Sequence, residues 1–140
     1  MDEVPVMVAR LEWDGEQQFT GFVGKHEVPI DGLQHAAASP MQLLAMSIAG
    51  CMAIDLLHIL QRGRHAVTSL TVGFRGERAP DHPKRFTRVA MHFTLAGGMK
   101  PEHVERALQL SREKYCSVWN SLRPGTALET TFEIEAAPVA

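Results

Sequence analysis

Cysteines and aromatic residues are scarce in this sequence of 140 residues. Two cysteines are too few for the disulfide framework that stabilises many small secreted proteins. Phe, Trp and Tyr make up 6% of the chain, and its 14 basic and 16 acidic residues are spread along it without a basic run. Nucleic-acid binding usually needs a basic surface with stacking aromatic rings, so we expect no nucleic-acid partner.

The sequence also lacks a secretory signal. It begins Met1, Asp2, Glu3, which is acidic where a signal peptide is basic, and no apolar segment follows directly. We therefore expect a cytoplasmic protein. With 45% apolar and 21% charged residues, the composition is ordinary for a globular protein of about one domain.

One segment, residues 41–60, is apolar over a length that could cross a membrane. Its only polar residues are Gln42, Ser47, Asp55 and His58. Asp55 near the middle would cost about 3 kcal/mol in lipid, and no second span accompanies it. We therefore expect no membrane association and a helix buried inside protein. A chain this small cannot easily cover both sides of such a helix, which indicates a partner subunit.

Alternating side chains and turn residues divide the chain into six strands and two helices. The strands are expected at residues 4–12, 19–24, 25–30, 67–79, 86–96 and 127–135, and the helices at residues 40–61 and 101–122. Asp14-Gly15 is the expected turn between the first two strands. The sequence predicts one α+β domain over residues 1–140 with the order β-β-β-α-β-β-α-β.

The first helix has clear signals at both ends. Ser39 fits the N-cap position, Pro40 suits the first helical position, and Gln42 completes a capping box with Ser39. Gly63 is expected to end the helix.

Cys51 lies in the middle of this helix, on the same face as Ile48 and Asp55. Gly50 precedes it and Ala53 follows closely. Such small neighbours leave a thiol accessible, as a substrate pocket requires. They are equally typical of a close helix crossing at which nothing larger than cysteine fits, so the residues alone leave both interpretations open.

Cys116 lies about 120° away from the apolar stripe of the second predicted helix, and need not belong to the core. If the helix breaks here, Ser117 could cap a short new helix. The dipole of that helix, with Arg112 and Lys114 nearby, would then lower the pKa of the Cys116 thiol. The alternative is a partly exposed cysteine without a role.

Metal and cofactor motifs are absent from the sequence. Cys51, Asp55 and His58 share a helix face, but a zinc site would want a fourth ligand, and no C-x-x-C, H-x-x-x-H or H-E-x-x-H pattern occurs. Gly97-Gly98 is too short for a phosphate-binding loop. We therefore expect neither a metal nor a cofactor.

Three segments carry a resemblance to a known family. They are Ser39-Pro40-Met41-Gln42-Leu43-Leu44, Ala49-Gly50-Cys51-Met52 and Glu113-Lys114-Tyr115-Cys116-Ser117-Val118. With 65 residues from one cysteine to the other, the chain resembles the OsmC/Ohr family of osmotically inducible protein C and the organic hydroperoxide resistance proteins. The Lys-Tyr-Cys-Ser-Val motif is similar to that of the OsmC-like branch.

The resemblance implies an α+β homodimer in which two chains interlock their sheets around paired central helices. It also implies catalytic roles for Cys51 and Cys116. Cys51 would attack the peroxide O–O bond and become a sulfenic acid, and Cys116 would condense with it to a disulfide that external thiols reduce. Hydroperoxide reductases of the family have a glutamate where this sequence has Met41, and an N-terminal arginine to which Arg10 does not align. Activation of the thiolate is then expected from Arg62, Arg64 or a partner's residue.

The sequence thus yields two functional hypotheses. The first is a thiol-dependent peroxidase, a redox protein that reduces organic hydroperoxides through Cys51 and Cys116 in oxidative-stress defence. The alternative is a non-catalytic protein of the same fold that binds a hydrophobic small molecule at the dimer interface. A separation of the two cysteines too large for a disulfide would favour the alternative.

Overall fold

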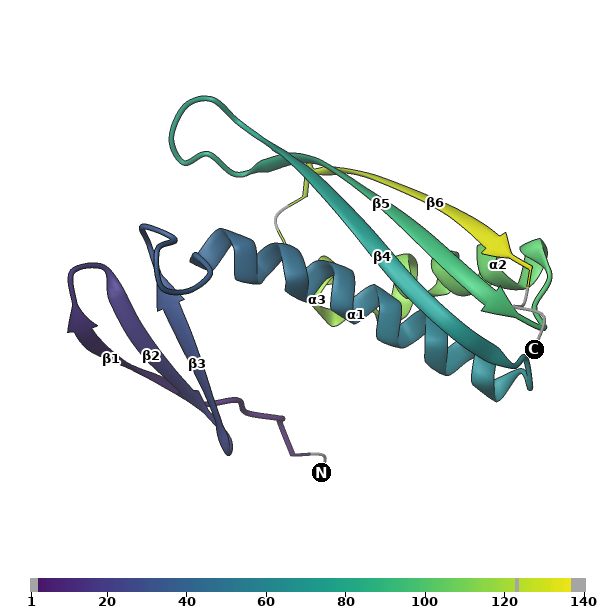
Figure 1. Cartoon of the computed structure of the whole chain (residues 1–140), viewed down its shortest axis with the longest axis horizontal. Coiled ribbons are helices and arrows are strands. Elements are labelled where there is room, and N and C mark those ends of the chain that lie inside the picture. The colour runs from purple at the N-terminus through teal and green to yellow at the C-terminus, as the bar shows by residue number, and fades with distance from the viewer. Residues whose placement is uncertain (1–2, 123, 137–140) are drawn as a thin grey trace. The chain divides into compact units, whose positions relative to one another are not determined.

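The computed structural model describes residues 3–122 and 124–136, so Met1 and Asp2 of the acidic start lie outside the described residues. The predicted order of strands and helices is confirmed, with the second helical segment divided into three pieces (Figure 1). The strands are β1 (Ala9–Gly15), β2 (Gln18–Val23), β3 (His26–Asp31), β4 (Val67–Arg78), β5 (Phe86–Gly97) and β6 (Ala127–Glu135). The helical elements are α1 (Pro40–Arg62), α2 (Pro101–Leu110), the π-helical turn η1 (Ser111–Tyr115) and α3 (Ser117–Asn120).

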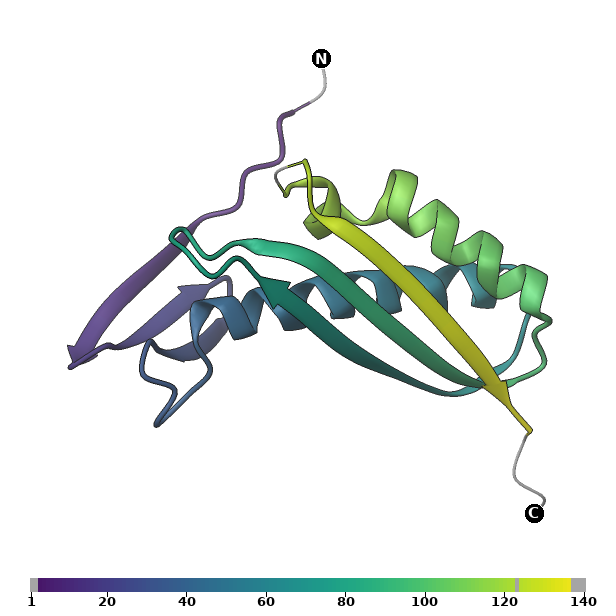
Figure 2. The ribbon, with the colours of Figure 1, turned by 90° about the horizontal axis from the view of Figure 1, so that it is seen from above.

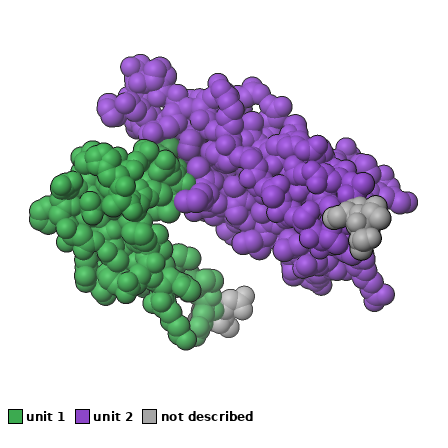
Figure 3. Space-filling model, in the orientation of Figure 1, with its two compact units in different colours: residues 1–44 green, residues 45–140 purple. Residues whose placement is uncertain are grey.

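The chain forms two compact units, residues 1–44 and residues 45–140, which Figure 3 shows in different colours. Each unit contains one three-stranded sheet, with the order β1-β2-β3 in the first and β4-β5-β6 in the second. Helix α1 begins in the first unit and continues through the second. That residues 1–140 form a single domain stays a prediction.

The sheet of the first unit is an antiparallel meander whose first strand is shorter and later than predicted. β1 begins at Ala9 rather than Val4, because Ala9 pairs with Val23, the last residue of β2, and the described residues 3–8 before it have no facing strand. The turn consists of residues 16–17 and not of Asp14-Gly15. Gly15 instead forms a β-bulge with a φ of +113°, which glycine adopts without steric cost.

Asp31 closes this sheet and organises the loop that follows it. Its side chain is 1% exposed, and its carboxylate accepts hydrogen bonds from the backbone N–H groups of Leu33 (2.9 Å), His35 (3.1 Å) and Ala36 (2.9 Å). The N–H groups, that of Ala36 above all, lower the pKa of Asp31 because they stabilise the ionised form. From its sequence context alone, Asp31 is expected only to take part in a turn.

The predicted capping box of α1 is confirmed. The backbone N–H of Ser39 donates to Oε1 of Gln42 at 2.9 Å, and the backbone N–H of Gln42 donates to Oγ of Ser39 at 3.2 Å. At the other end, α1 stops at Arg62, directly before Gly63 as expected, and the left-handed residue of the ending is Arg64 (φ +63°). The N–H of His65 bonds back to the Leu60 carbonyl at 2.9 Å, which completes a Schellman ending around Arg64.

Helix α1 buries one narrow stripe and leaves much of its apolar surface exposed. The fully buried residues follow a spacing of four: Ile48, Met52, Leu56 and Leu60. On other faces Met46 is 57% and Ile54 68% exposed. By length and composition α1 could cross a membrane, but core helices of globular proteins share these properties, so this alone does not place it in one. The expectation that α1 is buried all round is not met within this chain.

The sheet of the second unit has β5 at its centre, antiparallel to β4 and parallel to β6. The predicted alternation of β5 is confirmed. The side chains on its inner face are all buried: Val89, Met91, Phe93 and Leu95. α1 and the segment from α2 to α3 lie on one side of this sheet (Figures 1 and 2). The segment from α2 to α3 is also the connection between the parallel strands β5 and β6.

Candidate active site

The second predicted helix, residues 101–122, is interrupted where Cys116 lies. Residues 111–115 form a π-helical turn, in which the N–H of Cys116 donates to the carbonyl of Ser111, five residues earlier, at 2.7 Å. The side chain of Asn120 stabilises this interruption of the helix, because its Nδ2 donates hydrogen bonds to the carbonyls of Arg112 (3.1 Å) and Cys116 (2.8 Å). Single π-turns inside helices are rare and often occur at functional sites.

Cys116 is the N-cap of the short helix α3, so the prediction that Ser117 would cap it is wrong. The Sγ atom of Cys116 accepts a hydrogen bond from the backbone N–H of Trp119 at 3.3 Å. The thiol is 0% exposed, which also rules out a partly exposed cysteine. The π-turn explains the difference, because one extra residue per turn rotates all later side chains by about 100° and brings Cys116 into the core.

The buried position changes the acidity of Cys116 in the direction opposite to that predicted. Loss of water around the thiol raises its pKa to about 12, against a smaller lowering by the Trp119 N–H. A hydrogen bond with the Cys51 side chain and the nearby charges of Cys51 and Asp55 raise this pKa further. The dipole of the four-residue helix α3 does not offset these effects, so the Cys116 thiol is protonated near neutral pH.

Three reactive side chains meet at the junction of α1 with the π-turn. Sγ of Cys51, Sγ of Cys116 and a carboxylate oxygen of Asp55 all lie within 4.8 Å of one another. Both cysteines are free thiols; Cys51 is half-buried and Cys116 buried. Cys51 and Asp55 are one turn apart on α1, so the helix presents both to the Cys116 side. We refer to Cys51, Asp55 and Cys116 as the thiol cluster.

Ser111 positions the carboxylate of the thiol cluster. Its Oγ donates a hydrogen bond of 2.7 Å to Oδ2 of Asp55, and the Ser111 side chain is fully buried. In the sequence, Ser111 shares a helix face with apolar residues such as Val104 and Leu108. A serine among apolar stripe positions is the one signal that pointed to a buried polar partner.

Two arginines considered for the site, Arg10 and Arg112, contact groups other than the thiols. Arg10 pairs with Glu12 at 3.1 Å and covers the Phe22 ring at 4.6 Å, all within the first unit. Arg112 donates to the Leu128 carbonyl at 3.3 Å. Within residues 3–122 and 124–136, Asp55 forms no ion pair with arginine or lysine. The charged group that the structure brings within 4.8 Å of both thiols is the carboxylate of Asp55. Activation of the thiolate by Arg62, Arg64 or a partner's residue stays a prediction, and Arg62 lines the cavity that Asp55 also lines.

A cavity of about 420 Å³ adjoins the thiol cluster through Asp55. Its lining combines apolar and charged side chains: Asp55, His58, Ile59, Arg62, Leu110 and Tyr115. His58, which the sequence grouped with Cys51 and Asp55, lines this cavity but is not in the thiol cluster, where Cys116 takes its place. A cavity of this volume is large enough to hold a small molecule.

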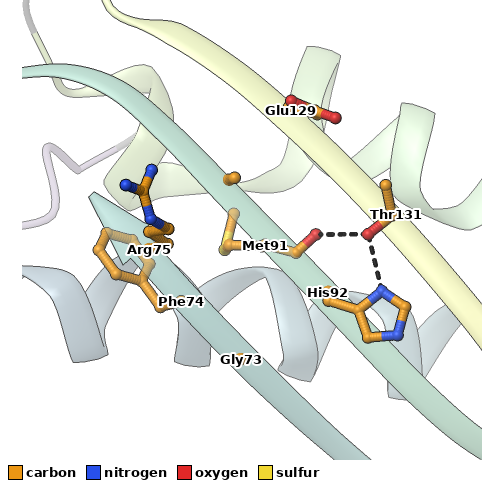
Figure 4. A pocket seen from close by; sticks show the side chains of 8 residues that line it. Gly73, Phe74, Arg75, Met91, His92, Glu129 and Thr131 are labelled. Carbon is orange, nitrogen blue, oxygen red and sulfur yellow. Dashed lines mark hydrogen bonds between the residues drawn. The ribbon is translucent and has the colours of Figure 1, made fainter. Parts of the chain in front are cut away.

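A second hollow, of about 290 Å³, lies on the other sheet face of the second unit (Figure 4). It exists because Gly73 and Ala90 are small and leave room between Arg75 and His92. The hydroxyl of Thr131 lies 2.7 Å from Nδ1 of His92 and donates to the Met91 carbonyl at 3.5 Å, as the dashed lines in Figure 4 show. Its lining contains no thiol, so the chemistry of this chain is better sought at the thiol cluster.

Comparison with known proteins defines the class to which this fold and paired thiols belong. The model of the OsmC-like protein family matches residues 31–131. Protein YhfA of Escherichia coli K12 is 37% identical over 134 residues, which cover 94% of this chain and all of YhfA. The chain belongs to the OsmC-like protein family, and the resemblance read from the sequence is confirmed.

Solved structures agree with this assignment. A hypothetical protein from Aquifex aeolicus VF5 has a TM-score of 0.89 at 29% identity, over 96% of this chain and all of that one. An organic hydroperoxide resistance protein OsmC from Legionella pneumophila has a TM-score of 0.66 at 15% identity, over 94% and 99% of the two chains. At 15% identity the second likeness shows the fold alone. Family membership supports a role in redox chemistry or peroxide defence at the level of the family.

Proposed function

We propose that the protein is a thiol-dependent peroxidase that reduces organic hydroperoxides through Cys51 and Cys116. The observation that carries this proposal is the thiol cluster, in which α1 and the π-turn bring two free thiols within 4.8 Å of each other. A disulfide needs an S–S distance of about 2.05 Å, so side-chain rotation with a small backbone shift would close the bond.

The unequal exposure of the two thiols supports their order of reaction. Cys51 is half-buried and can meet a hydroperoxide, whereas Cys116 is buried and protonated. The Cys51 thiolate attacks the O–O bond and takes one oxygen, so that it becomes a sulfenic acid and the hydroperoxide leaves as the alcohol. Cys116 then attacks the Cys51 sulfur, a disulfide forms, and water leaves. Two equivalents of an external thiol reduce the disulfide and restore both thiols.

Asp55 fits the role of proton acceptor in the second step. The Cys116 thiol must lose its proton as it attacks, and the hydroxyl that leaves the sulfenic acid must gain one. The Asp55 carboxylate lies within 4.8 Å of both sulfurs and is oriented by Ser111, so it can take the first proton and return it to the departing water. This role gives the Asp55 carboxylate a function beside the two thiols.

A homodimer belongs to the same proposal. Met46 and Ile54 are large apolar side chains of α1 that a single chain leaves exposed. A second copy of the chain would cover them, as the family's interlocked dimer implies. Free thiols fit a reducing compartment, so we place the protein in the cytoplasm, in oxidative-stress defence.

The alternative is a non-catalytic protein that binds a hydrophobic small molecule. The cavity beside Asp55 favours it, because about 420 Å³ lies within the range of ligand sites. The short distance between the thiols favours the peroxidase, since a binding protein has no need to hold two free thiols together.

The test is to add cumene hydroperoxide to the reduced full chain and to follow free thiols and intact mass. We expect one disulfide per chain and one cumyl alcohol per disulfide, with turnover when a dithiol is supplied. Cys51→Ser abolishes the reaction, whereas Cys116→Ser reacts once and then overoxidises at Cys51. If the wild-type chain keeps both thiols under excess hydroperoxide, the protein is not a peroxidase.

A further inference from the structure

We propose that the reduced thiol cluster is a binding site for a thiophilic divalent cation, of which Zn²⁺ is the natural probe. The ligands are Sγ of Cys51, Sγ of Cys116 and a carboxylate oxygen of Asp55. The sequence did not indicate this site, because His58 was the expected third member and Cys116 comes from a segment 65 residues after Cys51.

The separations within the cluster suit a zinc ion. An ion at the centre of a triangle with edges of at most 4.8 Å lies at most about 2.8 Å from each corner, against about 2.3 Å for Zn–S and 2.1 Å for Zn–O. A contraction of about 0.5 to 0.7 Å by each ligand closes the difference. Side-chain rotation supplies such a shift at Cys51 and Asp55, since both are only half-buried.

The surroundings also meet the needs of a metal site. Carboxylates that bind a metal normally also accept a hydrogen bond from a neighbouring group. Here the Ser111 hydroxyl donates one to Oδ2 of Asp55. The backbone N–H of Trp119 points at Sγ of Cys116 and stabilises a thiolate there. The cavity beside Asp55 provides access for the ion, and leaves a fourth coordination position for water or a small ligand.

The charges balance when the ion binds. Two thiols give up their protons, so that one Zn²⁺ replaces two H⁺ and is held by two thiolates and one carboxylate. Oxidation of the two thiolates to a disulfide by a hydroperoxide removes two of the three ligands and releases the ion. The hydroperoxide accepts two electrons and, with two protons, leaves as alcohol and water. The metal-bound and disulfide states are therefore mutually exclusive.

Metal binding does not depend on the proposed peroxidase, whereas release by hydroperoxide rests on it. A bound Zn²⁺ would occupy both sulfurs, so oxidation of the thiolates and release of the ion are one event. The same cluster would then act as a peroxide-sensitive metal site whose loading regulates the thiols.

The experiment uses the full chain, reduced and treated with a chelator, and titrates it with Co²⁺ as a spectroscopic probe. We expect one Co²⁺ per chain, a thiolate-to-cobalt charge-transfer band in the near ultraviolet, and displacement by Zn²⁺. Cys51→Ser and Cys116→Ser each abolish or strongly weaken the band. Asp55→Asn weakens Co²⁺ binding at least tenfold, and Ser111→Ala weakens it by about 10 to 100-fold.

Two controls separate this site from its alternatives. Glu105→Gln, an exposed change on α2, leaves the band unchanged. His58→Asn also leaves it unchanged, and a band that depends on His58 but not on Cys116 would overturn the site. Far-ultraviolet circular dichroism checks that each variant is folded. If Cys116→Ser does not fold, the variants of the half-buried Cys51 and Asp55 decide the test.

The outcomes for metal and peroxide are distinguishable. No charge-transfer band in the folded, reduced wild-type chain refutes the metal site, whatever the protein does with peroxide. A band that survives excess cumene hydroperoxide refutes the peroxidase and leaves the metal site in place. Release of Zn²⁺ to a chromogenic chelator, in step with loss of thiols, supports both.

Discussion

The hydroxyl of Ser111 donates a hydrogen bond of 2.7 Å to Oδ2 of Asp55, which lies 56 residues earlier in the chain. This bond joins the π-turn to α1 at the point where Cys51 and Cys116 meet. The bond links the two segments that hold the thiol cluster, so its removal should affect both.

Ser111→Ala removes the donor and leaves a half-buried carboxylate without its partner. Hydrogen bonds to charged groups contribute about 1.5–3 kcal/mol, and we expect the free energy of unfolding to fall by about 1–2 kcal/mol because Asp55 keeps some contact with water. Urea unfolding measures the change. Ser117→Ala, at an exposed position six residues nearer the next strand, is the matched control and should alter stability by less than about 0.5 kcal/mol.

Asp55→Asn tests the proton transfer proposed for disulfide formation. The amide keeps the shape of the side chain but cannot accept the Cys116 proton, so the second step slows by about 10²-fold or more while the oxidation of Cys51 continues. Trapping of the sulfenic acid with dimedone, followed by mass spectrometry, should show it accumulating on Cys51. The result that contradicts the role is a disulfide that forms at the wild-type rate; Glu105→Gln serves as the charge-matched control.

Ile54→Glu tests the second subunit. Ile54 is 68% exposed in the single chain, so a glutamate there costs little unless a partner covers it. We expect the wild type to elute as a dimer and Ile54→Glu to dissociate at micromolar concentration, because burying an unpaired carboxylate at an interface is costly. Light scattering coupled to size-exclusion chromatography gives the mass. A monomeric wild type would contradict the dimer, and Gln109→Glu on α2 checks that an added charge alone does not dissociate it.

Asp31→Asn tests the loop of the first unit through its pH dependence. Backbone N–H groups lower the pKa of Asp31 in the folded chain, so its ionised form stabilises the fold above the unfolded pKa of about 3.9. That contribution is lost as the pH falls through the lower folded-state pKa. The stability difference between wild type and Asp31→Asn should therefore be largest above pH about 4 and shrink in more acid solution. Thermal unfolding from pH 7 to pH 3 measures it, with the exposed Asp81→Asn as a control that shows no such trend.

Local sequence signals determined most of the secondary structure. The alternation of β5 predicted which of its side chains are buried, because the period of a strand is a local property. The capping box at Ser39 and Gln42 was also readable, since both hydrogen bonds form between neighbours in the chain. The limits of β6 agree with the prediction for the same reason.

The start of β1 was predicted too early because a contact with another strand decides it. β1 begins at Ala9 because β2 ends at Val23, and pairing has no signature in the first strand alone. α1 ends at Arg62, directly before Gly63 as expected. The left-handed residue of this ending is Arg64, although its side chain disfavours that conformation. The surrounding hydrogen bonds of the Schellman ending offset that cost.

The sequence by itself determined the family, the order of elements and the two cysteines worth attention. Only the tertiary structure decided how those cysteines meet. A π-turn, which has no sequence pattern of its own, rotates Cys116 into the core, where loss of water keeps its thiol protonated. The same turn aims Ser111 at Asp55, so a hydrogen-bonded carboxylate lies beside the two thiols. Spacing along a helix could place Asp55 near Cys51, but the remaining partners come from a segment more than fifty residues away, and packing alone brings them there.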